Sequence, residues 1–376
     1  MKLTRVTTYL VTLSLILTLT PPIMVTPVRQ TPERIGSHGT IKYSMRICYG
    51  VASHPWVLTK RDFEEMKILR VKYVRIDFIW QDFQPTRGAA FRFFKYDQYV
   101  EWAKSNSLEV IALMVYVPPW FTSLRSDQFT IPSGSSFNEF VAEYGEFVYT
   151  VVDHYKDDIT YFEIWNEANL CSYWNDSEGT LERGRYNRGF AVAKYVKLLK
   201  ESFIRAKAAN PSSRIISSGL GENDYVFVQQ MYENGVKGYF DYLGLHPYFW
   251  HGPIKNYDPD YVDWDNKNFE QFPKIELVRN VMVSCGDDDK HIFVTELGIG
   301  NSNGPQGVTT EEMRADRLRR LFEIIDHDPG YRFVNAVIWY QFRDSIASPS
   351  YAFSLLREDY NQTRMYYAYF DVINSR

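Results

Sequence analysis

The sequence lacks an excess of positive charge. Its 42 Lys and Arg residues are balanced by 46 Asp and Glu residues, which gives a formal net charge of −4 and a pI near 6.0. A protein that holds a nucleic-acid backbone presents a concentrated positive field to the phosphates. We therefore expect no nucleic-acid partner.

Cysteine is scarce, and the glycine-rich turn of a dinucleotide site is missing. The three cysteines, Cys48, Cys171 and Cys285, cannot all pair within one chain, and their spacing matches no zinc site. No group of His, Asp and Cys has the spacing of metal ligands, and no glycine-rich turn follows the first predicted strand. We therefore expect neither a cofactor nor a metal.

One long uncharged run stands near the start of the chain. Lys2 and Arg5 precede an uncharged stretch, residues 6–28, whose apolar centre is residues 10–19. This pattern is typical of an export signal, so we expect residues 1–30 to be a signal peptide and the protein to be secreted or extracellular. The alternative is an uncleaved N-terminal anchor that tethers the protein to the outer face of the cell membrane.

Aromatic residues are abundant. The 28 Tyr, 25 Phe and 9 Trp residues make up 16% of the chain. Aromatic rings form platforms for the apolar faces of sugar rings, but packed cores and interfaces use the same residues. Composition alone therefore suggests a carbohydrate partner without deciding for one, and it does not define the oligomeric state.

From residue 41 onward, short β-branched or aromatic runs alternate with longer segments of helical periodicity. The predicted strands are residues 43–49, 73–77, 109–115, 161–165, 214–218, 242–245, 291–295 and 334–340. The predicted helices are residues 59–70, 95–105, 137–155, 185–209, 224–234, 273–284, 310–326 and 360–374. Eight such units close naturally into a (β/α)₈ TIM barrel, which we expect as a single catalytic domain over residues 41–374. The alternative is a doubly wound open sheet, which the missing glycine-rich turn disfavours.

Two glutamates stand at the ends of predicted strands. Glu167 follows the fourth strand, and Glu296 follows the seventh. In a barrel of this kind the chemistry lies at the carboxyl ends of the strands, so both carboxyl groups are expected at one mouth. A pair of carboxyls roughly 5 Å apart is what a retaining glycosidase needs, one as acid and one as nucleophile. Taken singly, Glu167 has the alternative of a charge at a helix N-terminus, and Glu296 that of a salt-bridge partner.

These segments resemble glycoside hydrolase clan A. The run FEIWNEAN at residues 162–169 is similar to the acid/base strand of that clan, and VTELG at residues 294–298 is similar to its nucleophile strand. Further similar segments are VRID at 74–77, GLHPY at 244–248 and VIWY at 337–340. Within the clan, the runs WQDFQP at residues 80–85 and YVPPW at residues 116–120 look closest to the family 39 xylosidase-like and family 5 cellulase-like groups. The resemblance implies a barrel enzyme that hydrolyses β-glycosidic bonds of oligo- or polysaccharides with retention, through a covalent glycosyl-enzyme intermediate.

The resemblance also implies roles for individual residues. Glu167 would be the general acid and then the base, and Glu296 the nucleophile. Asn166 would bind the sugar 2-hydroxyl, and Arg75 would hold the nucleophile ionised and oriented. The other expected substrate-binding residues are His246 and Tyr248 in the polar mouth, Trp339 as the floor under the sugar ring, and Trp120 as an extension of that platform.

Each of these assignments has a structural alternative. The alternative for Asn166 is a loop cap, and the alternative for Arg75 is an ordinary ion pair with Asp77 or another barrel acid. The alternative for His246 is a packed core histidine. Trp339 and Trp120 have the alternative of plain packing.

The chain departs from the resembled pattern in two places. Many family 5 enzymes have a histidine at the end of strand three, whereas this chain reads MVYVPPW at residues 114–120, which weakens the family 5 placement. Ala168 stands where proline is common in the clan, which leaves the glutamate in place but gives a less rigid turn. The alternative functions are a non-catalytic carbohydrate-binding barrel and a transglycosylase that uses the same two glutamates.

Overall fold

A computed structural model of the chain describes residues 47–121, 128–176, 185–248, 272–299, 310–344 and 353–375. Residues 1–46 lie outside the described residues, and so does the predicted export signal. Among the described helices, none combines the length and the apolar character that a membrane crossing requires.

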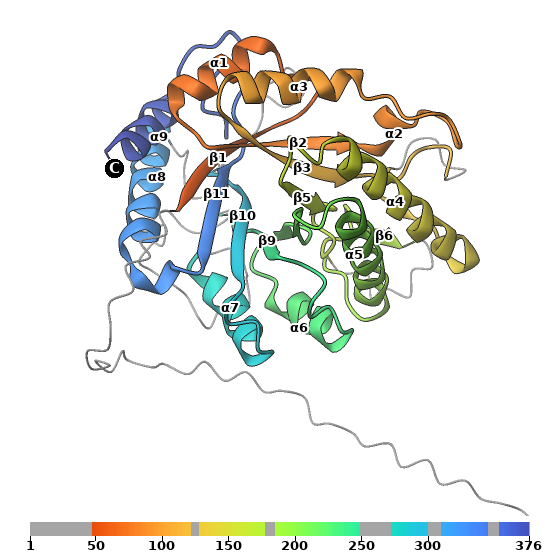
Figure 1. Ribbon diagram of the computed structural model, residues 1–376. Helices are drawn as coiled ribbons and strands as arrows, with labels where there is room; N and C mark the ends of the chain where they lie inside the picture. The colour runs from red at the N-terminus through yellow and green to blue at the C-terminus, as the bar shows by residue number, and fades with distance from the viewer. Residues whose placement is uncertain are drawn as a thin grey trace, which may run out of the picture. The chain divides into compact units, whose positions relative to one another are not determined.

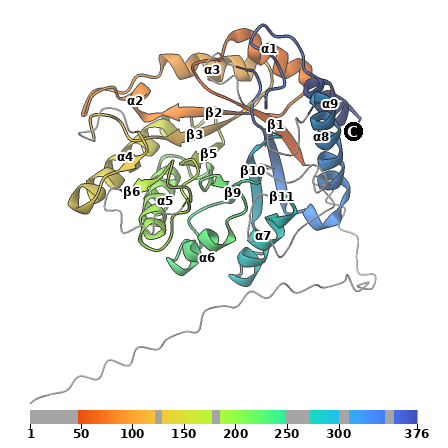
Figure 2. The ribbon, with the colours of Figure 1, turned by 180° about the vertical axis from the view of Figure 1, so that it is seen from behind.

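The described residues form a parallel barrel surrounded by helices (Figures 1 and 2). The barrel strands are β1 Cys48–Ser53, β2 Tyr73–Ile79, β3 Glu109–Val115, β5 Tyr161–Ile164, β7 Arg214–Ile216, β9 Tyr242–His246, β10 His291–Leu297 and β11 Val334–Trp339. They pair in the order β10-β11-β1-β2-β3-β5-β7-β9, and β9 also pairs with β10, which closes the ring. The predicted (β/α)₈ barrel is therefore confirmed.

The helices lie around this barrel, and each of the larger ones follows a barrel strand (Figure 1). They are α1 Lys60–Leu69, α3 Phe94–Ser105, α4 Gly134–His154, α5 Phe190–Ala209, α6 Tyr225–Glu233, α7 Ile275–Ser284, α8 Glu311–His327 and α9 Arg364–Asn374. Shorter elements are α2 Trp80–Phe83, β4 Thr130–Ile131, β6 Asn175–Asp176, β8 Leu220–Gly221, and the 3₁₀ turns Phe272–Lys274 and Pro329–Tyr331. Strands β4 and β6 pair with each other, and β8 extends the main sheet beside β9.

Helix starts follow from capping residues in the sequence. Thr310 and Thr363 precede α8 and α9, and each side chain accepts a hydrogen bond from a backbone N–H of the first helical turn. Helix α8 also carries Glu311 and Glu312 in its first turn, where negative charge is favourable.

The first strand lies later in the chain than predicted. The expected strand was residues 43–49, of which residues 43–46 lie outside the described part of the chain; β1 spans Cys48–Ser53 and includes Gly50. A Cβ atom at Gly50 would come within 2.6 Å of Tyr73 and Ile338, so this position leaves no room for the β-branched side chains that signal a strand. The shift moves the carboxyl end of β1 to His54.

The barrel interior changes character along each strand. Tyr73, Ile111, Phe293 and Ile338 belong to one buried apolar cluster inside the barrel. Because successive side chains of a strand alternate between faces, the residues two positions further along point into the same interior. On β2 and β10 these are Arg75 and Thr295, so a polar layer follows directly on the apolar one.

Candidate active site

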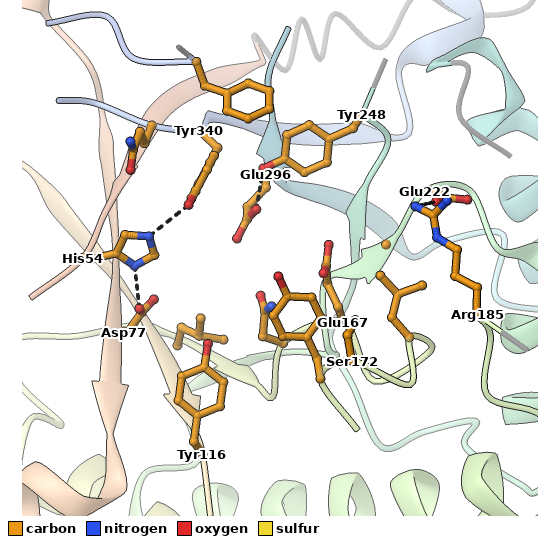
Figure 3. A pocket seen from close by; sticks show the side chains of 17 residues that line it. His54, Asp77, Tyr116, Glu167, Ser172, Arg185, Glu222, Tyr248, Glu296 and Tyr340 are labelled. Atoms are coloured by element: carbon orange, nitrogen blue, oxygen red, sulfur yellow. Dashed lines mark hydrogen bonds and ion pairs between the residues drawn. The ribbon is translucent and has the colours of Figure 1, made fainter. Parts of the chain in front are cut away.

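A cavity of about 470 Å³ lies at the carboxyl ends of the barrel strands (Figure 3). Strands β1, β2, β5, β9, β10 and β11 each end beside it. Its polar wall includes His54, Asp77, Asn166, Glu167, Tyr248, Glu296 and Tyr340. This is the end of the barrel at which the sequence predicts the chemistry.

Glu167 and Glu296 both face this cavity and are at least nine-tenths buried. His246 Nδ1 lies 3.0 Å from Glu167 Oε1 and 3.8 Å from Glu296 Oε2. These two carboxylate oxygens therefore cannot be further apart than the sum of the two distances, about 7 Å, a limit that includes the roughly 5 Å of retaining glycosidases.

Glu167 is fixed by its backbone. Its φ of 45° lies in the left-handed region, which a residue with a side chain seldom adopts. The Glu167 N–H donates to the carbonyl of Gly219 at 3.0 Å, and the N–H of Ala168 donates to Ser218 Oγ at 3.1 Å. The turn after β5 is thus anchored to the chain beyond β7, and this anchorage aims the Glu167 carboxyl into the cavity.

Arg75 connects three acceptors of the site. Its Nη1 donates to Glu296 Oε1 at 2.5 Å, its Nε to Glu163 Oε2 at 2.6 Å, and its Nη2 to Asn166 Oδ1 at 3.1 Å. Arg75 therefore contacts the predicted nucleophile and also forms the expected alternative, an ion pair with a barrel acid, which is Glu163 and not Asp77. Because a guanidinium only donates, the contact also fixes the Asn166 amide with its NH₂ group turned away from Arg75.

Both oxygens of Glu296 accept hydrogen bonds, since Tyr248 Oη donates to Oε2 at 2.5 Å. Burial by itself would raise the pKa of Glu296, but His246, Arg75 and the hydrogen bonds from Tyr248 and Arg75 together lower it below its ordinary value. The pKa of Tyr248 is raised well above its ordinary range by burial and by the Glu296 charge, so Tyr248 keeps its proton and remains a donor. Glu296 is thereby held as an oriented carboxylate.

One end of the cavity carries a polar group that the sequence did not reveal (Figure 3). His54 Nδ1 lies 2.7 Å from Asp77 Oδ2, and His54 Nε2 lies 3.1 Å from Tyr340 Oη. Burial would lower the pKa of His54, but the charge and hydrogen bond of Asp77 raise it above its ordinary value. The exposed Trp56 ring stacks on His54 with centroids 4.4 Å apart. If the first strand had been predicted at Cys48–Ser53, His54 would have stood at a strand end and would have been a candidate site residue.

The other end of the cavity lies beyond Glu167 (Figure 3). Glu222 is buried there, forms an ion pair with Arg185, and accepts a hydrogen bond from Tyr186 Oη. Gly221 brings the backbone close to Glu167, because a Cβ atom at Gly221 would lie 3.3 Å from Glu167 Oε1. Glu167 thus lies nearer to the charged end, and Glu296 lies beside Tyr248 on the wall shared with Tyr340.

The structure brings six of the eight predicted site residues together: Arg75, Asn166, Glu167, His246, Tyr248 and Glu296. Trp339 does not line the cavity. Its ring is fully buried against Phe322 and Tyr369, and its indole N–H donates to the carbonyl of Phe353 at 3.0 Å. The prediction that Trp339 forms the floor under the sugar ring is therefore wrong. Side chains alternate along β11, so the Trp339 ring points outward from the barrel and the next ring, Tyr340, points into the cavity.

Trp120 also lies apart from the cavity wall. Its indole N–H donates to the carbonyl of Gln84 at 2.9 Å, and its ring packs edge-on against Trp80. Trp120 therefore packs against its neighbours and does not line the described cavity, which is the structural alternative stated for it.

Comparison with solved structures finds barrels of the same kind. The fold is similar to that of a family 39 glycoside hydrolase from Bacteroides cellulosilyticus WH2, with a TM-score of 0.67 and 20% identity over 87% of this chain and 64% of that one. It is also similar to xylanase 10B from Thermotoga maritima, with a TM-score of 0.57 and 20% identity over 88% of this chain and 96% of that one. A monomeric β-xylosidase from Caulobacter crescentus matches with a TM-score of 0.62 and 16% identity, over 87% of this chain and 68% of that chain.

These likenesses establish the fold. They agree with the resemblance to clan A and family 39 drawn from the sequence motifs. The chain spans 64% of the length of the Bacteroides enzyme. No protein-family model and no curated protein matches the chain.

Proposed function

We propose that the protein is a retaining glycoside hydrolase that cleaves β-glycosidic bonds of oligo- or polysaccharides. The observation that carries this proposal is the pair Glu167 and Glu296 on one cavity, with Glu296 held as a carboxylate by Arg75 and Tyr248. A retaining glycosidase needs such a nucleophile opposite a carboxyl group that gives and takes a proton.

In the first step Glu167 gives its proton to the glycosidic oxygen as the bond between that oxygen and the anomeric carbon breaks. An oxygen of Glu296 bonds to the anomeric carbon in the same step, which forms a glycosyl ester and releases the leaving group. The end of the cavity with Arg185 and Glu222 is the leaving-group side, because it lies next to Glu167.

In the second step a water molecule takes the place of the leaving group. Glu167, now a carboxylate, accepts a proton from the water as the water oxygen bonds to the anomeric carbon and the bond to Glu296 breaks. Arg75 supports both steps. Its hydrogen bond and positive charge keep Glu296 ionised for attack in the first step, and they stabilise the Glu296 carboxylate as it leaves in the second.

The sugar that is cleaved binds between Glu296 and the end of the cavity with His54. There Asn166 presents its NH₂ group, and Asp77, Tyr340 and His54 offer acceptors and donors for ring hydroxyls. Since similar structures include xylosidases and xylanases, β-xylosides are the first substrates to test. Transfer to a sugar hydroxyl in place of water would proceed through the same intermediate, and product analysis with an added sugar acceptor separates the two.

The decisive experiment is hydrolysis of a panel of aryl β-glycosides by the wild type and by Glu296→Ala. We expect the substitution to lower kcat/KM by about 10⁴-fold or more, because the covalent step loses its nucleophile. Glu109→Gln is the matched control, since Glu109 stands at the amino end of β3 and pairs with Lys72 away from the cavity. Near-normal activity of Glu296→Ala would disprove the assignment.

A second measurement tests retention directly. A 2-fluoro aryl glycoside of the cleaved sugar should leave a covalent adduct that mass spectrometry of peptides locates on Glu296. Absence of label, together with inversion at the anomeric carbon, would contradict the retaining mechanism. Secretion or anchoring through residues 1–30 stays a prediction, which fractionation of expressing cells tests.

A further inference from the structure

A buried chain of polar contacts leads from Glu163 to the acid/base Glu167. Thr295 Oγ1 donates to Glu163 Oε1 at 2.8 Å, His246 Nε2 lies 3.1 Å from Thr295 Oγ1, and His246 Nδ1 lies 3.0 Å from Glu167 Oε1. The side chains of Glu163, Thr295 and His246 have no exposed surface. Contacts that are this deeply buried are not exchanged for water.

Glu163 is surrounded by donors. Its Oε2 accepts from Arg75 Nε at 2.6 Å, and its Oε1 accepts from the backbone N–H of Gly219 at 2.9 Å as well as from Thr295. A carboxylate only accepts, so the single hydroxyl proton of Thr295 is committed to Glu163.

This commitment sets the protonation of the histidine ring. Since the Thr295 proton points to Glu163, Thr295 can only accept on the side that faces His246, and Nε2 must carry a hydrogen. Two acceptors without a hydrogen between them would repel each other at 3.0 Å, so one proton also lies between His246 Nδ1 and Glu167 Oε1. Of the two protons on the His246 ring contacts, the one shared with Glu167 is nearer to the cavity, because Glu167 lines the cavity.

We propose that Thr295 and Glu163 are positioning residues that hold the acid proton on the pair formed by Glu167 and His246. The inference rests on the proposed function and adds two residues to it that do not touch the substrate. If Nε2 lost its acceptor, the ring could carry its only hydrogen on Nδ1, and Glu167 would then stay ionised and unable to protonate a leaving group.

The proton balance of the two steps follows from this arrangement. In the first step the proton between Oε1 and Nδ1 moves to the glycosidic oxygen, and His246 keeps its Nε2 hydrogen on Thr295. In the second step the proton from the attacking water returns to the same place, so the pair ends each cycle as it began.

The test compares Thr295→Val and Thr295→Ser on two aryl glycosides of the sugar that the wild type cleaves. A phenyl leaving group needs protonation, whereas 2,4-dinitrophenolate leaves without it. We expect Thr295→Val to lower kcat/KM about 100-fold on the phenyl glycoside and less than about 5-fold on the dinitrophenyl glycoside. Thr295→Ser keeps the hydroxyl and should restore most of the activity on the phenyl glycoside.

Equal losses on both substrates would mean that Thr295 has only a structural role, and unchanged phenyl activity of Thr295→Val would also overturn the inference. A second readout is nitrogen NMR of the protein labelled at histidine, with the His246 signal assigned by its loss in His246→Gln. Nε2 should carry hydrogen in the wild type and in Thr295→Ser, and its signal should change in Thr295→Val. A wild-type Nε2 without hydrogen would overturn the inference even if no glycoside is cleaved, so the two proposals fail separately.

Discussion

The two halves of the barrel interior are built by the same strands, yet they differ in chemistry. In the apolar layer, nearer to the amino ends of the strands, the rings of Tyr73 and Phe293 pack with their centroids 6.1 Å apart. Two residues further along β2 and β10, Arg75 and Thr295 belong to a buried hydrogen-bonded network. The apolar layer can be changed at a cost in packing, whereas every member of the polar layer has partners that lose a contact when it is removed.

The largest effect in the polar layer is expected for Arg75→Met. It leaves Glu163 and Glu296 buried without their shared cation, so we expect a loss of about 3–5 kcal/mol of folding free energy, measured by urea denaturation. Activity should fall at least as far as in Glu296→Ala. Retained stability would show that the two carboxylates do not depend on the guanidinium.

The next effect in size is expected for Gly219→Ala. A Cβ atom at this position would lie 2.0 Å from His246 Nε2 and 2.5 Å from Thr295 Oγ1, so the ring must shift from its position between Thr295 and Glu167. A displacement of this kind should lower kcat/KM by about 100-fold. Gly330→Ala is the control, because Gly330 is exposed on the turn after α8. Activity equal to that of the control would contradict the close contact.

A smaller effect, with a pH signature, is expected for Tyr248→Phe. The hydroxyl of Tyr248 helps to lower the pKa of Glu296, so its removal should raise that pKa. Glu296 attacks only when ionised, and therefore the acid limb of kcat/KM should move to higher pH, with about 10-fold lower activity at neutral pH. An acid limb that stays in place would show that Tyr248 does not influence the nucleophile.

The smallest effect on activity is expected for Phe293→Leu in the apolar layer. Loss of ring volume should lower stability by about 1–2 kcal/mol, seen as a shift of the urea midpoint. Its kcat/KM should stay within about two-fold of the wild type on both aryl glycosides. Because Phe293 and Thr295 lie on the same strand and the same face, comparison with Thr295→Val tests directly whether the two layers are separable.

Local pattern was sufficient for most of the fold. Periodicity placed β3 at residues 109–115 without error and put seven of the eight barrel strands close to their observed positions. It failed at β1, where Gly50 and Ala52 suit a crowded barrel wall and do not resemble a strand. That error also concealed His54, which lies at the carboxyl end of the strand.

Residue type at a strand end was a good guide to the site, but side-chain direction was not. Trp339 and Tyr340 are adjacent, and only the alternation along β11 decides that Tyr340 faces the cavity. Glu163 could have been predicted as a member of the buried network, since a charged residue inside an apolar strand needs buried partners.

The sequence by itself determined the alternation of strands and helices and the placement of Glu167 and Glu296 at strand ends. The resemblance also implied that Arg75 would hold Glu296, but only the tertiary structure decided that Arg75 meets Glu163 as well and that Asp77 meets His54. The physical reason is the distance along the chain over which each kind of interaction acts. Periodicity and turn signals act over a few residues, whereas Arg75 and Glu296 are 221 residues apart and meet only because barrel closure brings β2 and β10 to one interior.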